Sequence, residues 1–400
     1  MELITLDEVN AAAQRLAGVV QRTPVERSRT MSSISGWPVL LKCEHLQRTG
    51  SFKLRGAFSM ISRLTEAERA RGVVCASAGN HAQGVALSAQ LSGCRATVFM
   101  PERAPLPKVA ATRAYGAQVR LEGSSFDDAY EASVAFADDT GATYVHPFDH
   151  RDVIAGQASL GREILEQVPD AGTVVVPIGG GGLASGVASA VKLTRPEVRV
   201  VGVQAAGAAA FPGSLAAGRP QALASASTLA DGIAVKRPGD LTLAHVAARV
   251  DEVVTVSDEA IARAVLLLVE RAKQVVEPAG AAGLAAVLHR AAEMRPPVVA
   301  VLCGGNVDPL LLQRIMQSGM FEEGRYFALR TRLRDEPGAL SALLALVAEL
   351  GTNILAVGHH RMRTRLGVLE VEVELEVETR GPDHIDQLVQ TLVERGYPVT

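Results

Sequence analysis

A lysine beside an aromatic residue stands at the expected junction of a strand and a helix, in the segment Gly50–Gly56. A lysine at the mouth of a cleft can form a Schiff base with an aldehyde if its pKa is lowered. Lys53 is therefore a candidate for covalent chemistry. Taken alone it is weak evidence, because most lysines at such positions are solvated surface residues.

Four consecutive glycines, Gly179–Gly182, lie between an expected buried strand and an expected helix. They present several backbone N–H groups without side-chain obstruction, which suits a phosphate group. The segment matches neither the GxGxxG nor the GxxxxGK(S/T) pattern, so nucleotide binding is disfavoured. A purely structural role is the alternative, but each glycine costs folding entropy, and we expect a phosphate site.

Two further turns stand at the ends of expected strands. The segment Ser77–Gly84 begins a helix whose free amides and dipole suit a carboxylate, although an ordinary helix start capped by Asn80 is the alternative. The segment Val301–Asp308 ends another strand, where ligands of open α/β sheets gather. Cys303 in this segment could face a ligand or simply be a small buried residue.

Short apolar runs alternate with amphipathic stretches over most of the chain. Most runs are continuous, as in strands buried on both faces of a parallel sheet. The expected strands cover residues 39–43, 73–77, 96–100, 118–121, 173–178, 198–203, 253–256 and 298–302. The expected helices include residues 51–64, 81–91, 104–115 and 258–273. The alternation predicts an α/β fold, and the number of strands favours two α/β lobes with a cleft between them.

The pattern changes near residues 317–324. Beyond them the sequence predicts strands at 326–333, 353–362 and 367–378, helices at 339–350 and 383–395, and a terminal strand at 397–399. The unbroken alternation of Leu369–Val377 indicates a sheet that is wet on one face and packed on the other. The order βαββαβ is ferredoxin-like.

The composition fits a globular protein and excludes several classes of function. The chain is 48% hydrophobic and 21% charged, with a formal net charge of -3. It has no long run of like charge and only 4% aromatic residues, so no nucleic-acid partner is expected. The apolar stretch Val174–Val191 contains Pro177 and several glycines, so no membrane span is expected either. Scattered cysteines and the lack of a signal pattern favour the cytoplasm.

Together these motifs resemble the fold-type II enzymes that depend on pyridoxal 5′-phosphate (PLP), and within them the threonine deaminases (threonine ammonia-lyases). The segments that carry the match are residues 42–47, 51–57, 77–84, 179–183, 229–236, 277–281 and 303–306. The resemblance implies a two-lobed, tryptophan synthase β-like catalytic domain over residues 1–320, with a smaller lobe at about 42–150. The C-terminal part resembles an ACT domain, an amino-acid-binding module, over residues 327–400 after a linker at 321–326, with Asp335–Leu340 as its signature turn.

The resemblance also implies which residues surround the cofactor. Lys53 is expected to bind the PLP aldehyde and later to take the substrate Cα proton, with Phe52 beside the ring. Asn80 is expected to bond the 3′-oxygen, and Cys303 to face the pyridine nitrogen. A neutral thiol does not keep that nitrogen protonated, and the weaker electron sink suits β-elimination. The cofactor phosphate is expected on Gly179, Gly180, Gly181, Gly182 and Leu183.

The substrate carboxylate is expected in the loop formed by Ser77, Ala78, Gly79, Asn80 and His81. Serine racemases of the family carry a second serine where this chain has Ala78, so dehydration should dominate over racemisation. Some relatives bind a divalent cation through an acidic residue shortly after the strand that corresponds to Val200–Val203, but here Gln204–Gly207 offers no carboxylate. No metal is therefore expected.

Two weaker metal candidates do not change this expectation. Asp231 could form half of a cation site, but a turn residue is the simpler interpretation. His359 and His360 are adjacent on an expected strand, where neighbouring side chains point to opposite faces.

The expected reaction converts L-threonine to 2-oxobutanoate and ammonia, with L-serine as a second substrate and the cofactor phosphate as acid for the leaving hydroxyl. L-serine dehydratase and serine racemase are the alternatives, while threonine synthase would need extra basic residues for its phosphorylated substrate. A catalytically silent amino-acid sensor is a different class, but every position of the motif is filled. A role in isoleucine synthesis and a role in threonine breakdown both stay open.

The ACT-like region is expected to bind isoleucine or valine at an interface between copies of the chain. The residues expected near the effector are Pro337, Gly338, Ala339, Leu340, Asn353 and Ile354. Coupling to the cleft would give feedback regulation of roughly 1–3 kcal/mol. The alternative is a domain that only dimerises the enzyme. A homo-oligomer, either a dimer or a tetramer, is expected.

Overall fold

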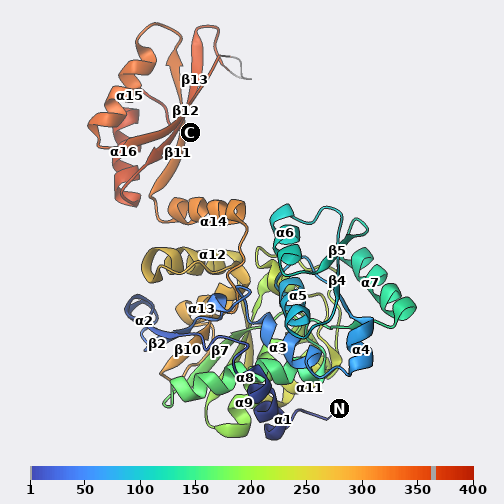
Figure 1. The fold of residues 1–400 in the computed structure, drawn as a ribbon. Helices are drawn as coiled ribbons and strands as arrows, with labels where there is room; N and C mark the ends of the chain where they lie inside the picture. Colours follow the sequence, from blue (N-terminus) through green and yellow to red (C-terminus); the bar gives the residue numbers. More distant parts are fainter. Residues whose placement is uncertain (1, 362–365) are drawn as a thin grey trace. The chain divides into compact units, whose positions relative to one another are not determined.

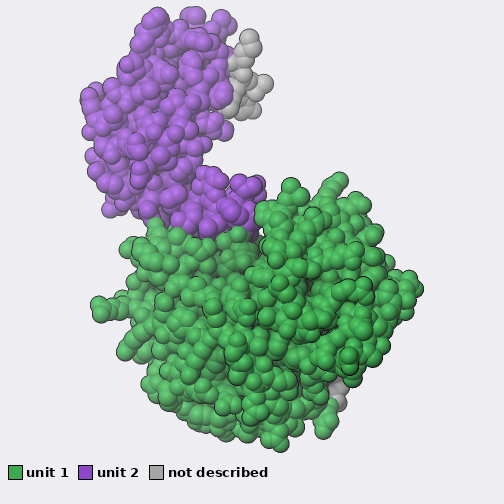
Figure 2. All heavy atoms as spheres, in the orientation of Figure 1, with its two compact units in different colours: residues 1–307 green, residues 308–400 purple. Residues whose placement is uncertain are grey.

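The computed structural model describes residues 2–361 and 366–400. The chain divides into two compact units, residues 1–307 and residues 308–400, which Figure 2 distinguishes by colour. The sequence placed the boundary at residue 320. Helix α14 (Pro309–Glu322) groups with the second unit, because it packs with strand β11 (Tyr326–Arg334) of that unit.

The larger lobe of the first unit is a six-stranded sheet in the order β1-β2-β10-β7-β8-β9. Its strands are β1 Val25–Ser28, β2 Val39–Lys42, β10 Val298–Val301, β7 Thr173–Pro177, β8 Arg199–Ala205 and β9 Glu252–Val256. All neighbours are parallel except β1 and β2. The strands β2, β7 and β10 are largely apolar and almost wholly buried, as the continuous hydrophobic runs predict for a sheet covered on both faces.

Helices cover both faces of this sheet, with α8 (Arg151–Gln167), α9 (Gly182–Thr194) and α11 (Asp240–Arg249) on one side (Figure 1). On the other side lie α12 (Asp258–Leu267) and α13 (Pro278–Leu288). The remaining helices of this lobe are α1 Leu6–Leu16, α2 Arg29–Ser35 and α10 Ala210–Ala217. The buried side chains of α8 and α9 form the main core with the strands.

The smaller lobe is a parallel sheet of four strands in the order β5-β4-β3-β6. The strands are β3 Val73–Ala76, β4 Ala96–Met100, β5 Gln118–Leu121 and β6 Thr143–Tyr144. The helices are α3 Lys53–Ile61, α4 Glu66–Arg71, α5 Asn80–Leu91, α6 Leu106–Ala114 and α7 Phe126–Thr140. The chain enters this lobe after β2 and returns through α8, so the first unit has two α/β lobes.

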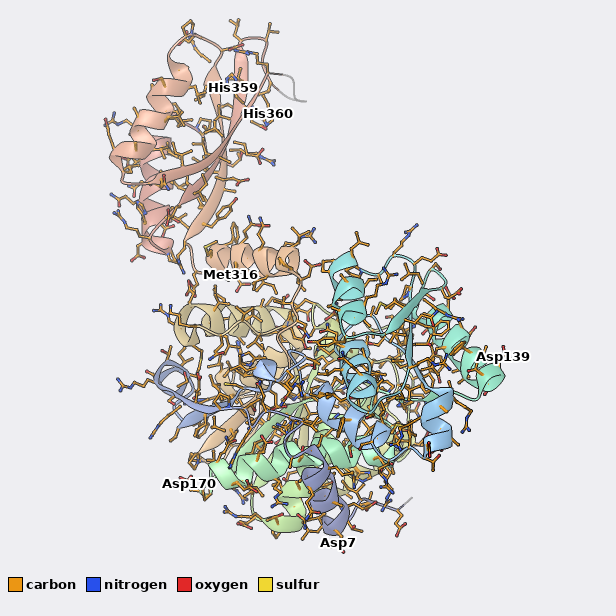
Figure 3. All side chains as sticks on the ribbon, viewed as in Figure 1. Asp7, Asp139, Asp170, Met316, His359 and His360 are labelled. Atoms are coloured by element: carbon orange, nitrogen blue, oxygen red, sulfur yellow. The ribbon has the colours of Figure 1, made fainter. Side chains whose placement is uncertain are left out.

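The second unit is a small α+β body. Strand β11 is followed by α15 (Ala339–Glu349), β12 (Asn353–His360), β13 (Glu370–Glu378) and α16 (Pro382–Glu394), and the antiparallel sheet has the order β11-β13-β12. The apolar alternate residues of β13 pack on both helices, while its glutamates form the wet face, as the alternation predicted. His359 and His360, labelled in Figure 3, pair with Val373 and Glu372 and so point to opposite faces.

The structure differs from the sequence-based elements in short segments. Strands β1 and β6 were not predicted, because three of the four residues of β1 are polar or charged and β6 has only two residues. The expected terminal strand at 397–399 is not formed; instead Thr400 exchanges two backbone hydrogen bonds with Arg330, of 3.0 and 2.9 Å. Pro398 has no N–H to continue a ladder. The expected strand at 353–362 ends at His360, and Met362 lies outside the described residues.

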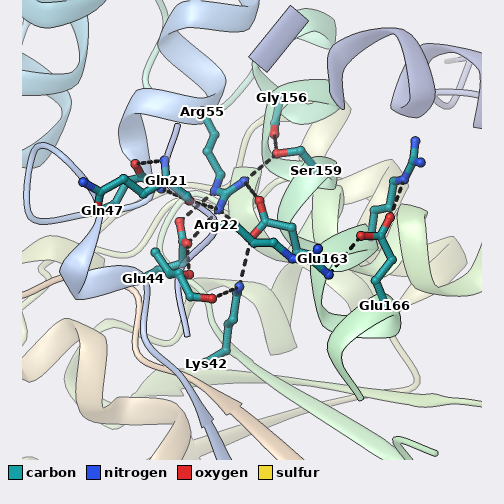
Figure 4. Close-up of polar contacts among 12 residues, drawn as sticks. Gln21, Arg22, Lys42, Glu44, Gln47, Arg55, Gly156, Ser159, Glu163 and Glu166 are labelled. Atoms are coloured by element: carbon teal, nitrogen blue, oxygen red, sulfur yellow. Dashed lines mark hydrogen bonds and ion pairs between the residues drawn. The ribbon is translucent and has the colours of Figure 1, made fainter. Parts of the chain in front are cut away.

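A cluster of three buried charges and the partly buried Glu163 joins β2, α3 and α8 (Figure 4). Arg55 donates to both carboxylate oxygens of Glu44 at 2.7 and 2.8 Å, and to both of Glu163 at 2.7 and 2.9 Å. Lys42 donates to Glu163 at 2.9 Å, and its Nζ also reaches Thr23 O at 2.8 Å. The positive charges of the two cations balance the negative charges of the two carboxylates. Arg55 lies on the first turn of the helix that begins with Lys53.

Pairing keeps the central charges of this cluster ionised despite their burial. Burial works to raise the pKa of Glu44, but Arg55 holds that pKa below its ordinary value. Burial works to lower the pKa of Arg55, and the two glutamates raise it instead. The cluster therefore fixes the start of α3 against β2 and α8 through charge-assisted hydrogen bonds. Removing one partner would leave an uncompensated buried charge and destabilise the fold.

Replacing Arg55 with Leu should destabilise the first unit by about 3–5 kcal/mol, because Glu44 would stay buried without its partner. Urea unfolding of the wild type and the variant measures the difference. Arg162→Leu is the control, since Arg162 forms an exposed pair with Glu166 and its loss should change stability by less than about 0.5 kcal/mol. Equal effects of the two substitutions would contradict a structural role for the buried cluster.

Among the residues described, no helix is long and apolar enough to cross a membrane.

Candidate active site

Lys53 lies where the two lobes of the first unit meet, as the first residue of α3. The Phe52 amide donates to Cys303 O at 3.1 Å, and Ser51 pairs with Gly304 in an isolated bridge. The lysine segment and the segment after β10 therefore lie side by side. Lys53 Nζ donates to Pro147 O at 2.9 Å and lies 5.3 Å from the centre of the Phe52 ring.

The amine of Lys53 is poised to act as a nucleophile. Burial lowers its pKa to about 8, against smaller opposing effects of Cys303 and Glu277. Removing the ammonium group from water disfavours its charged form, so the neutral amine is populated closer to physiological pH than for an exposed lysine. This is the property that Schiff-base chemistry requires.

The glycine turn forms a cradle of backbone amides at the N-terminus of α9. In the described parts of the chain, the amides of Gly179–Gly182 donate no hydrogen bond. Gly181 adopts a φ of 99°, a conformation that favours glycine, and a Cβ at Gly180 or Gly182 would overlap Phe148. Thr242 Oγ1 donates to Gly180 O at 2.7 Å and steadies the turn. Unpaired amides at a helix start fit a phosphate group.

The loop after β3 provides a second set of backbone amides, at the start of α5. Ser77 Oγ accepts a hydrogen bond from the Gly79 amide at 3.2 Å, and space is open around the Gly79 Cα, so a ligand can approach the backbone. Ala78 carries no hydroxyl. The ring of His81 turns away to Val145 O at 2.8 Å, and burial lowers its pKa to about 3. Nε2 of His81 is therefore not available to a ligand, whereas its backbone amide at the start of α5 is.

Asn80 and Cys303 complete the wall beside Lys53. The Cys303 thiol is buried, its Sγ lies 3.7 Å from Ala279 O, and burial raises its pKa well above the ordinary value. It is therefore a neutral group, as the expected role opposite a pyridine nitrogen requires. The Asn80 Nδ2 donates to Glu277 Oε1 at 2.7 Å, and Asn306 Nδ2 donates to Asn80 Oδ1 at 2.7 Å.

Three contributors to this site were not assigned a role from the sequence. Glu277 and Asn306 stood in matching motifs without a function, and Phe148 with its neighbours showed no signal at all. Burial raises the pKa of Glu277 to about 7, helped by Asp231 and opposed by its hydrogen bond from Asn80. A carboxyl group that titrates near neutrality inside a site is typical of functional positions.

These features fit the expected cofactor. The Lys53 amine of lowered pKa suits the aldehyde of PLP, and the backbone amides of the glycine turn suit its phosphate. The side-chain amide of Asn80 suits the ring oxygen, and the neutral thiol of Cys303 suits the ring nitrogen. Within residues 2–361 and 366–400, no group of three or more His, Cys, Asp or Glu side chains could hold a metal ion. Asp231 instead pairs with Lys108 at 3.1 Å.

The residues expected around an effector lie in the second unit, in two separate places. Pro337–Leu340 precede and begin α15, where Gly338 has a φ of 92°. Asn353 and Ile354 follow the other end of that helix, which is roughly 16 Å long. The register of the sheet also separates the two groups, because Arg334 pairs with Glu370 at one end of β13 and Asn353 pairs with Glu378 at the other. One copy of the chain does not bring the two groups together.

Known proteins resemble this chain over most of its length. Residues 16–304 match the family model described as pyridoxal-phosphate dependent enzyme. The chain is 49% identical over 397 residues to the L-threonine ammonia-lyase of Thermotoga maritima, covering 99% of both chains. It is 45% identical over 392 residues to the L-threonine ammonia-lyase of Geobacter sulfurreducens, covering 98% of both.

Solved structures of similar proteins superpose on most of this chain. The T.th. threonine deaminase superposes with a TM-score of 0.73 at 43% identity, covering 76% of this chain and 99% of its own. Maize serine racemase superposes with a TM-score of 0.74 at 37% identity, covering 81% of this chain and 100% of its own. Both superpositions cover the whole of the solved chain or nearly so.

Glu277→Gln should make the cofactor-free protein more stable at pH 8 than the wild type, by about 1–3 kcal/mol. The raised pKa means that the folded state binds more protons than the unfolded state between pH 4.5 and about 7, so ionisation of Glu277 lowers stability as the pH rises through this window. Glutamine removes that dependence. Urea unfolding at pH 5 and pH 8 measures it, and the gap between variant and wild type should widen with pH.

The exposed Glu293→Gln variant is the control and should show no such widening. A constant gap for Glu277→Gln at both pH values would contradict the buried, titrating carboxyl.

Proposed function

Because the chain belongs to the family of pyridoxal-phosphate dependent enzymes, we propose that it is a threonine ammonia-lyase, which converts L-threonine to 2-oxobutanoate and ammonia. The observation that carries the proposal is a set of contacts around Lys53. Its Nζ bonds Pro147 O, the next residue Phe148 packs against the glycine turn, and the Phe52 amide bonds Cys303 O. The support for threonine is the similarity to L-threonine ammonia-lyases over nearly the full chain.

The chemistry is divided between cofactor and protein. Bound PLP supplies an aldehyde that captures the substrate amino group and an electron sink for the electrons of the Cα–H bond. Lys53 holds the cofactor and, once released by the substrate, takes the Cα proton at Nζ. The backbone amides of Asn80 and His81, at the start of α5, hold the substrate carboxylate. The amides of Gly179–Gly182 would hold the cofactor phosphate, which would supply an acid for the leaving hydroxyl.

The neutral thiol of Cys303 favours elimination over racemisation. A neutral thiol does not keep the ring nitrogen protonated, so the ring stabilises negative charge at Cα only weakly. Loss of the β-hydroxyl removes that charge. Ala78 provides no hydroxyl acid that could reprotonate Cα from the other side. Serine has the same leaving group as threonine and is proposed as a second substrate. Serine racemase is the alternative, suggested by the superposition with the maize enzyme.

Lys53→Ala should lose both the visible absorption of the bound cofactor and the production of 2-oxobutanoate, because no other amine replaces Nζ at the site. Lys236→Ala, which changes an exposed lysine paired with Asp127, should keep both. Absorption spectra of the PLP-loaded proteins and an oxoacid assay with L-threonine and L-serine measure the effect. A wild type that releases no oxoacid, or a Lys53→Ala variant that releases it at the normal rate, would remove the proposal.

The second unit is proposed to be an ACT-type regulatory domain that binds isoleucine or valine. Its βαββα order, with Thr400 bonded to the outer edge of β11, supports a ferredoxin-like module. Gly338 and Asn353 lie at opposite ends of α15, so an effector that touches both must lie between two copies of the chain. This geometry supports a homo-oligomer, which we propose to be a dimer or tetramer.

Isoleucine or valine should lower threonine turnover by about 5–150-fold at saturation if the effector couples to the first unit with ordinary strength. Titration of each amino acid against the initial rate measures the coupling. Turnover that is unchanged by both amino acids would leave the unit with an assembly role only.

A further inference from the structure

Glu277 is a buried carboxyl in the site with no part in the chemistry proposed above. It precedes the first turn of α13, and its backbone amide donates to Gly304 O at 3.0 Å. A Cβ at Gly304 would overlap its carboxylate, so the group lies directly against the segment after Cys303. Its hydrogen-bond partner is Asn80, which belongs to the other lobe.

The two ends of the Asn80 amide have different partners. Glu277 Oε1 accepts from Nδ2 at 2.7 Å on one side. On the other side Asn306 Nδ2 donates to Asn80 Oδ1 at 2.7 Å. The orientation of Asn306 is itself set, because its Nδ2 also donates to Thr49 O at 2.8 Å and a carbonyl can only accept.

This chain of hydrogen bonds determines which way the Asn80 amide points. In the flipped orientation Asn80 Nδ2 would face the Nδ2 of Asn306, donor against donor. Its Oδ1 would face the carboxylate of Glu277, acceptor against acceptor. In the observed orientation one hydrogen of Nδ2 is used by Glu277 and the second stays available.

We propose that Glu277 and Asn306 are positioning residues, which orient Asn80 so that one N–H of its amide is always presented to the 3′-oxygen of PLP. The inference rests on the proposed cofactor site. The two residues come from the larger lobe and Asn80 from the smaller one, so the same bonds tie the lobes together beside Lys53. Without them the amide would rotate freely and present its oxygen to an anionic oxygen part of the time.

The charged and titratable groups that face Glu277 do not replace this role. Asp231 and Cys303 face it from η3 (Asp231–Ile233) and from the end of β10, and Lys108 and Lys53 face it from α6 and α3. A protonated Glu277 can still accept from Asn80 through its carbonyl oxygen, and Asn306 donates to Asn80 whichever charge Glu277 carries. Both bonds therefore persist across the titration of the carboxyl.

Two cofactor analogues separate positioning from a general effect on the fold. The first is 4-deoxypyridoxine 5′-phosphate, which lacks the aldehyde and therefore binds without a bond to Lys53. The second is the same compound without its ring 3-oxygen. Equilibrium binding of each to the cofactor-free full chain, followed by fluorescence, isolates the hydrogen bond from Asn80.

Glu277→Ala and Asn306→Ala should each weaken the first analogue about tenfold and the second less than about threefold, because only the first uses the oriented N–H. Glu277→Gln keeps an accepting oxygen and should bind both analogues within about threefold of the wild type. In an Asn80→Ala background, Asn306→Ala should have no further effect on the first analogue. Glu293→Ala, at an exposed position, is the control.

Equal weakening of both analogues would overturn the inference, since it would indicate a general change in the pocket. Unchanged binding of the first analogue in both alanine variants would overturn it as well. A wild type that binds neither analogue would instead remove the cofactor site and with it the proposed function. The outcomes therefore distinguish the two proposals.

Discussion

The structure depends on one costly placement, the burial of the Lys53 amine between two lobes. An ammonium group removed from water is destabilised, and this lowers its pKa to about 8. Such a group must be held in position by surroundings that are stable for other reasons. Its hydrogen bond to Pro147 O orients Nζ, while its helix is held by charges one turn away.

The scaffold meets this demand with paired charges and with strand ends. Arg55 ties the first turn of α3 to Glu44 and Glu163, so the backbone at Lys53 is fixed by strong, saturated contacts. The segments after β3, β7 and β10 of the two parallel sheets then bring an amide loop, the glycine turn and Cys303 to the same place. This arrangement follows the general rule that ligands of parallel α/β sheets bind at the carboxyl ends of the strands.

Local chemistry explains which parts of this site could be predicted from the sequence. The glycine turn and Cys303 each follow a strand closely, and Lys53 begins a helix in a short glycine-bounded segment. The hydrogen bonds that orient Asn80 could not be predicted, since their partners Glu277 and Asn306 are 197 and 226 residues away in the chain. Such contacts depend on how two lobes close. In the fold, the long buried strands were predictable, whereas β1, β6 and the bonding of Thr400 depend on tertiary pairing.

The central claim is that Lys53 carries the cofactor, and a chemical trap tests it most directly. Borohydride reduction of the PLP-loaded protein should fix the cofactor to the chain, and mass spectrometry of the digested product should then find the pyridoxyl phosphate group on the peptide that contains Lys53. Recovery of the label on another lysine, or of unlabelled Lys53 from a fully loaded protein, would contradict the account.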